Sequence, residues 1–454
     1  MAKAKAKKTT VPRRAPEAPA GSGISAIGVE GFKSLSGRTE IAIRPLTILA
    51  GANSSGKSSI MQPLLLMKQT LEAPYDPGAL LLDGPHVQFT SVEQLFTRGG
   101  RKPRTDFSVS IVHASGERVD VRYDRLPRGG LDVAETAQHF AESSVFVVRR
   151  GMSRAELAAS LDSMRLLAST ADPHSPAGEV VVSRDRCFLD ALEVAYFVDF
   201  ETDTSPLQPT AVVGGELRSA IHIPAHRGSP ERTYRTTAIG PNFPGPFLPY
   251  VASVVHHWQA TRDVRIKQLG ASLARLGLNW KVEAARLDDT RVELRVGRLK
   301  QKTTGGAHDL VSLADVGFGV SQCLPVLVAL LTAEPGQLVY IEEPEIHLHP
   351  RAQVALADLL ADAANRGVRV VIETHSSLLL TGVQALVAEG TLPPDRVALH
   401  WFSLDDDGMT EVKSAELDEA GAFGEWPEDF AEVTLDAQAR YLDAAEKRLR
   451  QGRR

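Results

Sequence analysis

Apolar and polar positions divide the first part of the chain into short runs. Residues 24–51, ISAIGVEGFKSLSGRTEIAIRPLTILAG, form three strand-like runs separated by Gly and Ser. Residues 61–71 follow, and their apolar pattern predicts a helix. The chain is therefore expected to pass from a strand, through a loop at residues 51–60, into a helix.

A second stretch of alternating helices and strands begins near Asp309. Helices are predicted at residues 313–333 and 351–364, and apolar strands at QLVYIEE (337–343) and VRVVIETHS (368–376). The region between the two stretches contains alternating strands at DFSVSIV, RVDVRYDRL and VELRVGRL, a helix at 153–169 and Pro/Gly-rich turns at 241–249. A β-rich insertion with a helical lid is therefore predicted between two α/β parts.

The composition is that of an ordinary globular protein. The 454 residues are 43% hydrophobic and 24% charged, which allows two or more packed units. No apolar run reaches transmembrane length and the first residues lack the apolar segment of a secretory signal, so we expect a cytoplasmic protein without a membrane partner. Cys187 and Cys323 lie far apart, which predicts neither a disulfide framework nor a cysteine zinc site.

Basic residues are concentrated at both ends of the chain, although the net charge is -5. The Ala/Pro-rich residues 1–23 are expected to be disordered, and residues 447–454 close the chain with further Lys and Arg. Two interpretations remain open: solvated tails, or tails that attract nucleic acid electrostatically. The negative net charge argues against a protein that is basic over its whole surface.

The loop GANSSGKSSI fits the pattern G-x-x-x-x-G-K-[ST]. Its glycines allow backbone amides to surround phosphates at a helix N-terminus, Lys57 can reach the β- and γ-phosphates, and the Ser58 hydroxyl can ligate Mg²⁺. An accidental Gly/Ser turn is the alternative, and the flanking strand and helix argue against it. The candidate nucleotide-binding residues of this loop are Gly51, Asn53, Ser54, Gly56, Lys57, Ser58 and Ser59.

Two adjacent acids, Glu342 and Glu343, end an apolar strand. Because side chains alternate along a strand, Glu342 is predicted to face Mg²⁺, and Glu343 to orient or deprotonate a water near the γ-phosphate. A solvated acidic turn is the alternative. His375 ends the next apolar strand and is predicted to sense the γ-phosphate, although taken alone it is better explained as a structural histidine.

The segment DVGFGVSQ places Gly317, Gly319, Ser321 and Gln322 at the start of a helix, which predicts a second anion site made of backbone amides. Two such helix ends are explained if two subunits pair head to tail and each lends this helix start to the phosphate loop of the other. ATP would then lie in the interface of a homodimer. A helix N-cap without a ligand is the alternative.

In this order, the motifs FKSL, GANSSGKS, FGVSQ, YIEEPEIHLHP and ETHS resemble those of the ABC-type ATPase heads of the RecF, Rad50, SMC and OLD group, in particular the small OLD-like bacterial AAA ATPases. The resemblance covers the two ends of the chain and implies ATP and Mg²⁺ as cofactors. The matching residues are Lys57 and Ser58 in the phosphate loop, Gly319 and Ser321 in the signature, Glu342 as magnesium acid, Glu343 as catalytic glutamate, His347 and His349 in the D-loop, and His375 as the switch.

Three features depart from the common pattern of the group. The magnesium acid is Glu342 instead of Asp, and the signature is FGVSQ instead of LSGGQ, which both fit the OLD-like branch. Gln94 is the candidate Q-loop ligand of the metal, with Gln62 and Gln69 as alternatives. The Toprim nuclease unit of OLD enzymes is not expected, because few residues follow the switch and DDDG at 405–408 is typical of an acidic turn.

Within the insertion, the segment IHIPAHRGSPERTY contains Arg227 and Arg232. Both side chains are expected either to face phosphate or nucleic acid, or to lie on the surface of the arm. The sequence leaves these two alternatives open.

The sequence thus predicts an α/β protein, with the P-loop NTPase fold of an ABC-type head, a β-rich and helical inserted arm or lid, and a short C-terminal segment. The expected parts are a disordered basic tail at 1–23, the two parts of the ATPase lobe at 24–100 and 306–396, the inserted region at 101–305, and a C-terminal strand and helix at 397–454.

The resemblance implies an ATPase that dimerises on ATP, hydrolyses it and gates a partner effector in prokaryotic anti-phage defence or DNA surveillance. The effector is expected to be a nuclease or toxin encoded nearby, DNA or RNA is a further candidate partner, and the homodimer can extend to a higher oligomer. Two alternatives remain: a RecF-like repair or maintenance ATPase that clamps DNA itself, and an ATP-dependent scaffold with slow turnover.

Overall fold

The computed structural model describes residues 22–99, 103–140, 145–165, 179–196, 202–207, 210–278, 281–297, 309–424 and 440. The predicted basic tail lies outside these ranges except for its last two residues. The basic residues 447–454 and the predicted terminal helix also lie outside the described residues.

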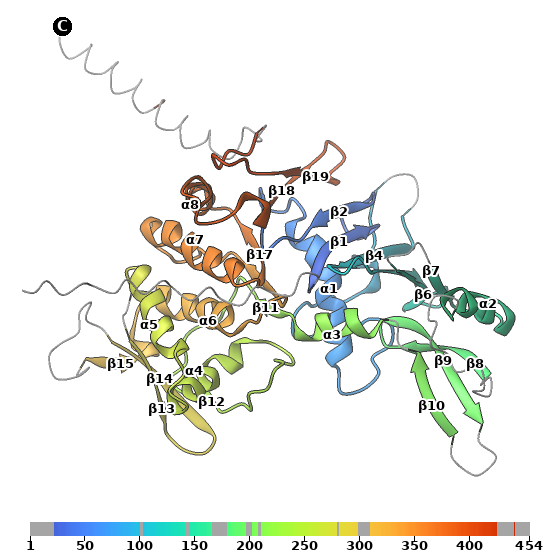
Figure 1. Cartoon of the computed structure of the whole chain (residues 1–454), viewed down its shortest axis with the longest axis horizontal. Helices are drawn as coiled ribbons and strands as arrows, with labels where there is room; N and C mark the ends of the chain where they lie inside the picture. The colour runs from blue at the N-terminus through green and yellow to red at the C-terminus, as the bar shows by residue number, and fades with distance from the viewer. Residues whose placement is uncertain are drawn as a thin grey trace, which may run out of the picture.

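A six-stranded, mostly parallel sheet lies at the centre of the protein (Figure 1). Its order is β11 (Ile221–Ile223), β16 (Leu338–Glu342), β17 (Arg369–Thr374), β3 (Leu46–Gly51), β18 (Val397–Leu404) and β19 (Thr410–Ala415). All neighbours are parallel except β18 and β19. The carboxyl ends of β3, β16 and β17 therefore lie at the same edge of the sheet.

Helices cover both faces of this sheet, and the strands are apolar for that reason. One face packs against α4 (Val251–Ala260), α5 (Arg265–Arg275), α6 (Phe318–Thr332), α7 (Pro350–Asn365) and α8 (Ser377–Ala388), and the other against α1 (Lys57–Glu72) and α3 (Ala211–Ser219). The predicted helices at 61–71 and 351–364 are confirmed. The helix predicted at 313–333 is shorter, because α6 begins at Phe318 and ends at Thr332, and residues 313–315 form a separate 3-10 turn, η3 (Leu313–Asp315).

Alternate side chains of the central strands enter two different cores. Ile341 belongs to the core on the α4–α8 side, whereas Tyr340 and Val371 belong to the core on the α1 side. Because successive side chains of a strand face opposite sides, Glu342 and Glu373 lie on the same face as Tyr340. Strand alternation therefore brings both carboxylates to the α1 side of the sheet.

A second six-stranded sheet is antiparallel, with the order β2 (Thr39–Ala42), β1 (Ile24–Glu30), β4 (Asp106–His113), β5 (Arg118–Arg125), β6 (Leu131–His139) and β7 (Val145–Arg149). It combines strands from the predicted ATPase part at 24–100 with strands from the predicted insertion. The insertion also contributes β11 to the edge of the central sheet. Strands of the region 101–305 therefore complete both sheets, and the boundaries at 100 and 306 stay predictions.

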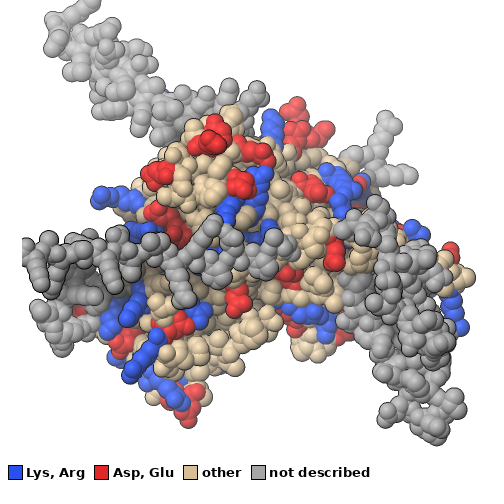
Figure 2. Space-filling model, viewed as in Figure 1, with Lys and Arg blue, Asp and Glu red and all other residues tan. Residues whose placement is uncertain are grey.

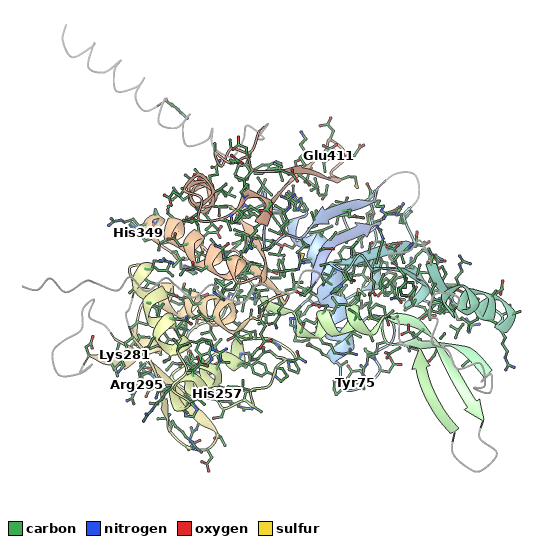
Figure 3. The ribbon with its side chains drawn as sticks, viewed as in Figure 1. Tyr75, His257, Lys281, Arg295, His349 and Glu411 are labelled. Carbon is green, nitrogen blue, oxygen red and sulfur yellow. The ribbon has the colours of Figure 1, made fainter. Side chains whose placement is uncertain are left out.

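The remaining elements form smaller units. They are α2 (Arg154–Arg165), β8 (Glu179–Asp185), β9 (Phe188–Tyr196), β10 (Thr202–Leu207), β12 (Tyr234–Arg235), β13 (Val282–Arg286), β14 (Arg291–Gly297), β15 (Leu310–Ser312), η1 (Val92–Gln94), η2 (Leu248–Tyr250) and η4 (Pro394–Arg396). Figure 3 shows Lys281 and Arg295 close to each other, at the end of the β13–β14 pair that lies away from its connecting turn. The strands predicted at DFSVSIV, RVDVRYDRL and VELRVGRL are confirmed as β4, β5 and β14.

The C-terminal part contains a strand, as predicted, and the helix predicted after it lies outside the described residues. The strand β18 has 8 residues, most of them buried, and it pairs directly with the phosphate-loop strand β3. A second strand, β19, follows β18. Because β18 is covered on both faces, its apolar run is an interior part of the central sheet and not an appended segment.

The surface carries mixed charges. Figure 2 shows Lys and Arg side chains interspersed with Asp and Glu over the visible face. In the part of the chain that the structure describes, no helix combines the length and the apolarity needed to cross a bilayer. Cys187 and Cys323 are both buried and unbridged.

Candidate functional site

The phosphate loop joins the end of β3 to the start of α1. Gly56 precedes α1 with a φ of 98°, and a Cβ at this position would lie 2.2 Å from Thr410 Oγ1, so only glycine fits there. Lys57 Nζ donates hydrogen bonds to the carbonyl oxygens of Gly51 (3.1 Å) and Ala52 (2.8 Å). The loop therefore curls around the lysine at the N-terminus of α1, a position suited to anions.

The other predicted loop residues differ in exposure. Asn53 and Ser54 are exposed at the tip, and Ser54 adopts the left-handed region with a φ of 63°. Ser59 is buried in the first turn of α1, and Ser58 is half-buried. The tip is thus open to a ligand, whereas the helix start is anchored in the protein.

Glu373 is the carboxylate that contacts the phosphate loop. Ser58 Oγ donates to Glu373 Oε2 at 2.8 Å, and the Tyr340 hydroxyl donates to the other carboxylate oxygen. Glu373 is only 4% exposed, and burial raises its pKa to about 7, with Glu342 acting in the same direction. Glu373 was not among the predicted site residues, although an acid inside the apolar run VRVVIETHS is itself a signal of function.

Glu342 is the register partner of Glu373 on the neighbouring strand. His222 Nε2 donates to Glu342 Oε1 at 3.1 Å, and the backbone amide of Ala225 donates to Oε2 at 3.1 Å. Burial by itself raises the pKa of Glu342, but these hydrogen bonds outweigh burial and bring the pKa below its usual value. Glu342 is therefore held as a carboxylate on the α1 face of the sheet.

The chain leaves β16 at Glu343, which adopts the left-handed region with a φ of 43°. Its backbone amide donates to the carbonyl of Glu373 at 2.9 Å, and its Oε1 lies 3.7 Å from His375 Nε2. Arg227 Nη2 donates to the carbonyl oxygens of Glu342 (2.5 Å) and Glu343 (3.2 Å). A strained backbone held in this way is typical of functional turns.

Arg227 and Arg232, for which the sequence left two alternatives, differ in their surroundings. Arg227 is 8% exposed and lies behind the strand end, so it is not a surface residue of an arm. Arg232 is exposed and pairs with Asp315 at 2.8 Å. The side chain of Arg227 therefore supports the acidic turn.

His375 lies beside the phosphate loop, directly after β17. Its backbone amide donates to Glu345 Oε1 at 2.9 Å, and the Thr374 hydroxyl donates to the same oxygen at 2.6 Å. Burial lowers the pKa of His375, and the charge of Lys57 lowers it further, so the ring is neutral near pH 7. Glu345 was not predicted as a site residue; the third acid of IEEPE is the sequence signal that could have indicated it.

The predicted signature residues lie at the start of α6. Gly317 and Phe318 are exposed, whereas Ser321 and Gln322 are buried and bonded inside the chain: Ser321 Oγ donates to the Phe318 carbonyl at 3.0 Å, and Gln322 Nε2 donates to the Gly228 carbonyl at 2.8 Å. Among the described residues, no hydrogen bond or ion pair joins the start of α6 to the phosphate loop. The signature role stays a prediction.

The D-loop histidines lie on the same side as the start of α6. A Cβ at Gly319 would lie 3.3 Å from the His347 carbonyl, and the rings of His347 and Phe318 are 5.8 Å apart. His349, labelled in Figure 3, caps α7 by accepting a hydrogen bond from the Arg351 amide at 3.3 Å. His349 therefore has a structural role at a helix N-terminus.

The three candidate Q-loop glutamines have partners of their own. Gln94 bonds to Thr90 through both amide atoms, at 2.9 and 3.1 Å. Gln62 accepts from Lys33 Nζ at 2.7 Å, and Gln69 is buried against backbone groups. Within the described ranges, none of the three amides is hydrogen-bonded to Ser58, and Gln94 as a metal ligand stays a prediction.

Oxygen ligands of the type that Mg²⁺ prefers converge below the phosphate loop. The Ser58 hydroxyl and the carboxylates of Glu342 and Glu373 come from α1 and from two adjacent strand ends. Among the described residues, no group of three or more His, Cys, Asp or Glu side chains is arranged to hold a metal ion by itself. This donor set fits a Mg²⁺ ion that is shared with nucleotide phosphates, because such ions take few protein ligands.

The fold and the site together define a P-loop NTPase, with a mostly parallel sheet, a phosphate loop between β3 and α1, and acids at the end of β16. The family described as "AAA ATPase domain" matches residues 23–116. The family described as "AAA domain, putative AbiEii toxin, Type IV TA system" matches residues 228–381. Family models of AAA ATPase domains thus match both parts of the chain that carry the site.

Three solved structures of SMC heads are similar to this chain. The SmcHead bound to the C-winged helix domain of ScpA has a TM-score of 0.47 and 13% identity, over 88% of this chain and 99% of that chain. The SMC head domain from Thermotoga maritima has a TM-score of 0.38 and 11% identity, over 87% and 100%. The Smc head domain with an extended coiled coil bound to the C-terminal domain of ScpA, from Pyrococcus furiosus, has a TM-score of 0.42 and 11% identity, over 87% and 96%. No curated protein matches the chain.

Proposed function

We propose that the protein binds ATP with Mg²⁺ and hydrolyses it to ADP and phosphate. The observation that carries this proposal is the convergence of Lys57, Ser58, Glu342, Glu343 and His375 at one edge of the central sheet. Mg²⁺, when bound, would neutralise negative charge on the β- and γ-phosphates. Lys57 would bind the same phosphates after it exchanges the carbonyl oxygens of the loop for phosphate oxygens.

In this proposal, Glu343 orients a water and accepts its proton as the water attacks the γ-phosphorus. The bond between this phosphorus and the bridging oxygen breaks at the same time, and ADP leaves with that oxygen. The neutral His375 ring, 3.7 Å from Glu343, would hydrogen-bond the γ-phosphate or the same water. The carboxylate of Glu343 is also near enough to the phosphate loop to raise the pKa of Lys57 in part, against the larger lowering by burial.

The proposal includes a head-to-tail homodimer. Phe318 is 52% exposed and begins α6, whose N-terminal amides favour anions. Within the described part of the chain, these amides make no hydrogen bond to the phosphate loop of the same copy. We therefore propose that they face the phosphate loop of a second copy. The signature residues Gly317, Gly319, Ser321 and Gln322 would then complete the ATP site of the partner.

The biological role that we propose is the ATP-dependent gating of an effector, such as a nuclease or toxin, in prokaryotic defence or DNA surveillance. The family description at residues 228–381, which refers to a toxin and a type IV TA system, supports this role. ATP state would hold or release the effector through the closure of the dimer.

A Glu343→Gln variant tests the hydrolytic part. We expect phosphate release to fall by at least about 100-fold, because the general base is lost, whereas ATP binding persists. Light scattering with ATP should then show a more persistent dimer than for the unchanged protein. The exposed Glu389, which follows the last residue of α8, offers a matched control, and Glu389→Gln should leave both readouts unchanged. Unchanged phosphate release by the Glu343 variant would reject the catalytic role of Glu343.

Mixing two inactive variants tests the shared site. Lys57→Ala removes the phosphate-loop lysine, and Gly319→Asp places a negative charge at the start of α6. A mixed dimer has one site with both changes and one with neither, so the mixture should recover about a quarter of the activity. If the mixture stays inactive while mixed dimers form, the head-to-tail arrangement is wrong.

A further inference from the structure

A chain of buried polar side chains leads from Glu342 into the protein. His222 Nε2 lies 3.1 Å from Glu342 Oε1, and His222 Nδ1 lies 3.2 Å from His86 Nδ1. His86 Nε2 lies 3.5 Å from Glu72 Oε2, and Lys68 Nζ donates to Glu72 Oε1 at 2.5 Å. The side chains of Lys68, Glu72, His86 and His222 are at most 8% exposed. Four ionisable groups are therefore buried in one continuous row behind the acid of the nucleotide site.

The row is assembled from segments that are far apart in the sequence. Lys68 and Glu72 face each other across one turn of α1, His86 lies in the loop that follows α1, and His222 is the middle residue of β11. The His222 ring stacks on Tyr340, with ring centroids 5.2 Å apart and an interplanar angle of 10°. The row thus connects the far end of the phosphate-loop helix to the end of β16.

The hydrogen-bond directions in the row follow from its two ends. A carboxylate only accepts, so His222 must donate from Nε2 to Glu342. Glu72, at the other end, also only accepts, so His86 must carry a proton on Nε2 to interact favourably with Glu72 Oε2, 3.5 Å away. Burial lowers the pKa of His86, and the interaction with Glu72 raises it in part. The bond to Glu342 therefore has one defined direction, with His222 as the donor.

Both oxygens of Glu342 are fixed by this arrangement. One accepts from His222 and the other from the amide of Ala225, which follows β11. Glu72 is fixed from three sides, because it also accepts from the Gly245 amide at 3.1 Å. Burying such a row is costly compared with an apolar core of the same shape. A role for these buried polar side chains in orienting Glu342 toward a ligand would explain why the protein retains them.

We propose that His222, supported by His86, Glu72 and Lys68, is the positioning residue that holds the Glu342 carboxylate in the orientation required for the divalent cation. This inference rests on the proposed function, in which Glu342 serves the cation bound with ATP. His222 acts through Glu342 and touches neither the nucleotide nor the cation.

A His222→Phe variant tests the inference, because Phe keeps a ring stacked on Tyr340 but removes both ring nitrogens. We measure Mn²⁺ affinity by electron paramagnetic resonance in the presence of a non-hydrolysable ATP analogue, and analogue binding in EDTA by fluorescence. The Mn²⁺ dissociation constant should rise at least about tenfold, whereas binding in EDTA should stay within about twofold. His222→Gln, which offers an amide donor, should recover part of the Mn²⁺ affinity.

His400 provides the matched control. It is a buried histidine of the same sheet, 2% exposed, and it bonds to Ser414 Oγ at 2.7 Å and to the Ala42 carbonyl at 2.8 Å, without a contact to Glu342. His400→Phe should lower stability but leave Mn²⁺ affinity unchanged. His86→Phe should weaken Mn²⁺ binding in the same direction as His222→Phe but by less, and it keeps the inference testable if His222→Phe does not fold.

The outcomes separate the inference from the proposed function. If the unchanged protein binds Mn²⁺ with the analogue and His222→Phe binds it equally well, the positioning role is overturned while the proposed function stands. If His400→Phe weakens Mn²⁺ binding as much as His222→Phe does, the effect is a general loss of stability and the positioning role is likewise overturned. If the unchanged protein binds no Mn²⁺ with the analogue, the proposed function fails, and the inference fails with it.

Discussion

Glu373 at the nucleotide site and Asp190 on β9 are both buried carboxylates, and both are 4% exposed. Burial raises the pKa of Glu373 to about 7 and that of Asp190 to about 6. Glu373 accepts hydrogen bonds from the hydroxyl groups of Ser58 and Tyr340. These hydrogen bonds and the nearby charge of Lys57 lower the pKa of Glu373 and so offset part of the effect of burial. Asp190 accepts one, from the Thr210 hydroxyl at 2.9 Å, and its other oxygen has no partner among the described residues.

The difference between the two acids lies in what surrounds them. Glu373 lies next to a second carboxylate, Glu342, and to the Ser58 hydroxyl at the phosphate loop. A bound cation would therefore reduce the repulsion between the two carboxylates. Asp190 also has a carboxylate nearby, Asp185, which raises its pKa, and it is bonded to the Thr210 hydroxyl, but β8 and β9 lie outside the central sheet that carries the phosphate loop. In the proposed function, the cost of burying Glu373 therefore serves cation binding, whereas Asp190 lies on β9, outside the central sheet.

Replacing Glu373 by Gln should give the largest effect: the rate of ATP hydrolysis should fall, whereas the free energy of unfolding should rise. ATP hydrolysis should fall by about 100-fold, or about 2.7 kcal/mol in activation free energy, because Ser58 and the cation lose a negative partner. The free energy of unfolding of the unliganded protein at pH 8 should rise by about 1 to 3 kcal/mol, because a buried charge is removed. Phosphate release and urea denaturation measure the two quantities.

Tyr340→Phe is the companion variant for Glu373→Gln, because it removes one hydroxyl and leaves the charge in place. It should lower hydrolysis by less, about tenfold, since Glu373 still accepts from Ser58. If Glu373→Gln left hydrolysis unchanged, the acid would have no role at the site, as is expected of Asp190, and the contrast between the two acids would be rejected.

The local part of the site could be predicted from the sequence. The phosphate loop at residues 51–60 forms between a strand and a helix, as expected, because its geometry depends on neighbours in the chain. The acids at the end of β16 and the histidine after β17 also follow from strand ends that the apolar pattern marks. Each of these motifs is short, so its backbone conformation is determined by residues that are close together in the sequence.

Contacts between distant segments could not be predicted. Ser58 and Glu373 are 315 positions apart, and their contact depends on the order of β17 and β3 in the sheet. His222 reaches Glu342 only because β11, from the predicted insertion, pairs with β16. An alternating pattern indicates a strand but does not specify its neighbours, which are decided by the packing of both faces. For the same reason, the sequence did not indicate that β4 to β7, from the predicted insertion, share a sheet with β1 and β2.

The pH dependence of the free energy of unfolding should test the role of Asp190. The expected effect is smaller than that of Glu373→Gln. A carboxylate whose pKa is raised on folding stabilises the protein below its unfolded pKa of 3.8, and this stability is lost as pH rises through the folded pKa of about 6. Between pH 5 and pH 8, Asp190 should therefore lower the free energy of unfolding by about 1.4 kcal/mol. Urea denaturation at both pH values measures this change.

Asp190→Asn should remove this part of the pH dependence, since the amide does not titrate and can still accept from Thr210. Stability at pH 8 should rise while ATP hydrolysis stays the same, because β9 lies outside the central sheet that carries the site. Hydrolysis would then be lost in Glu373→Gln but retained in Asp190→Asn, although both acids are equally buried. The difference would be explained by the location of Glu373 beside the phosphate loop. An unchanged pH slope in Asp190→Asn would instead assign the slope to another buried group, such as Glu216, whose pKa is also raised by burial.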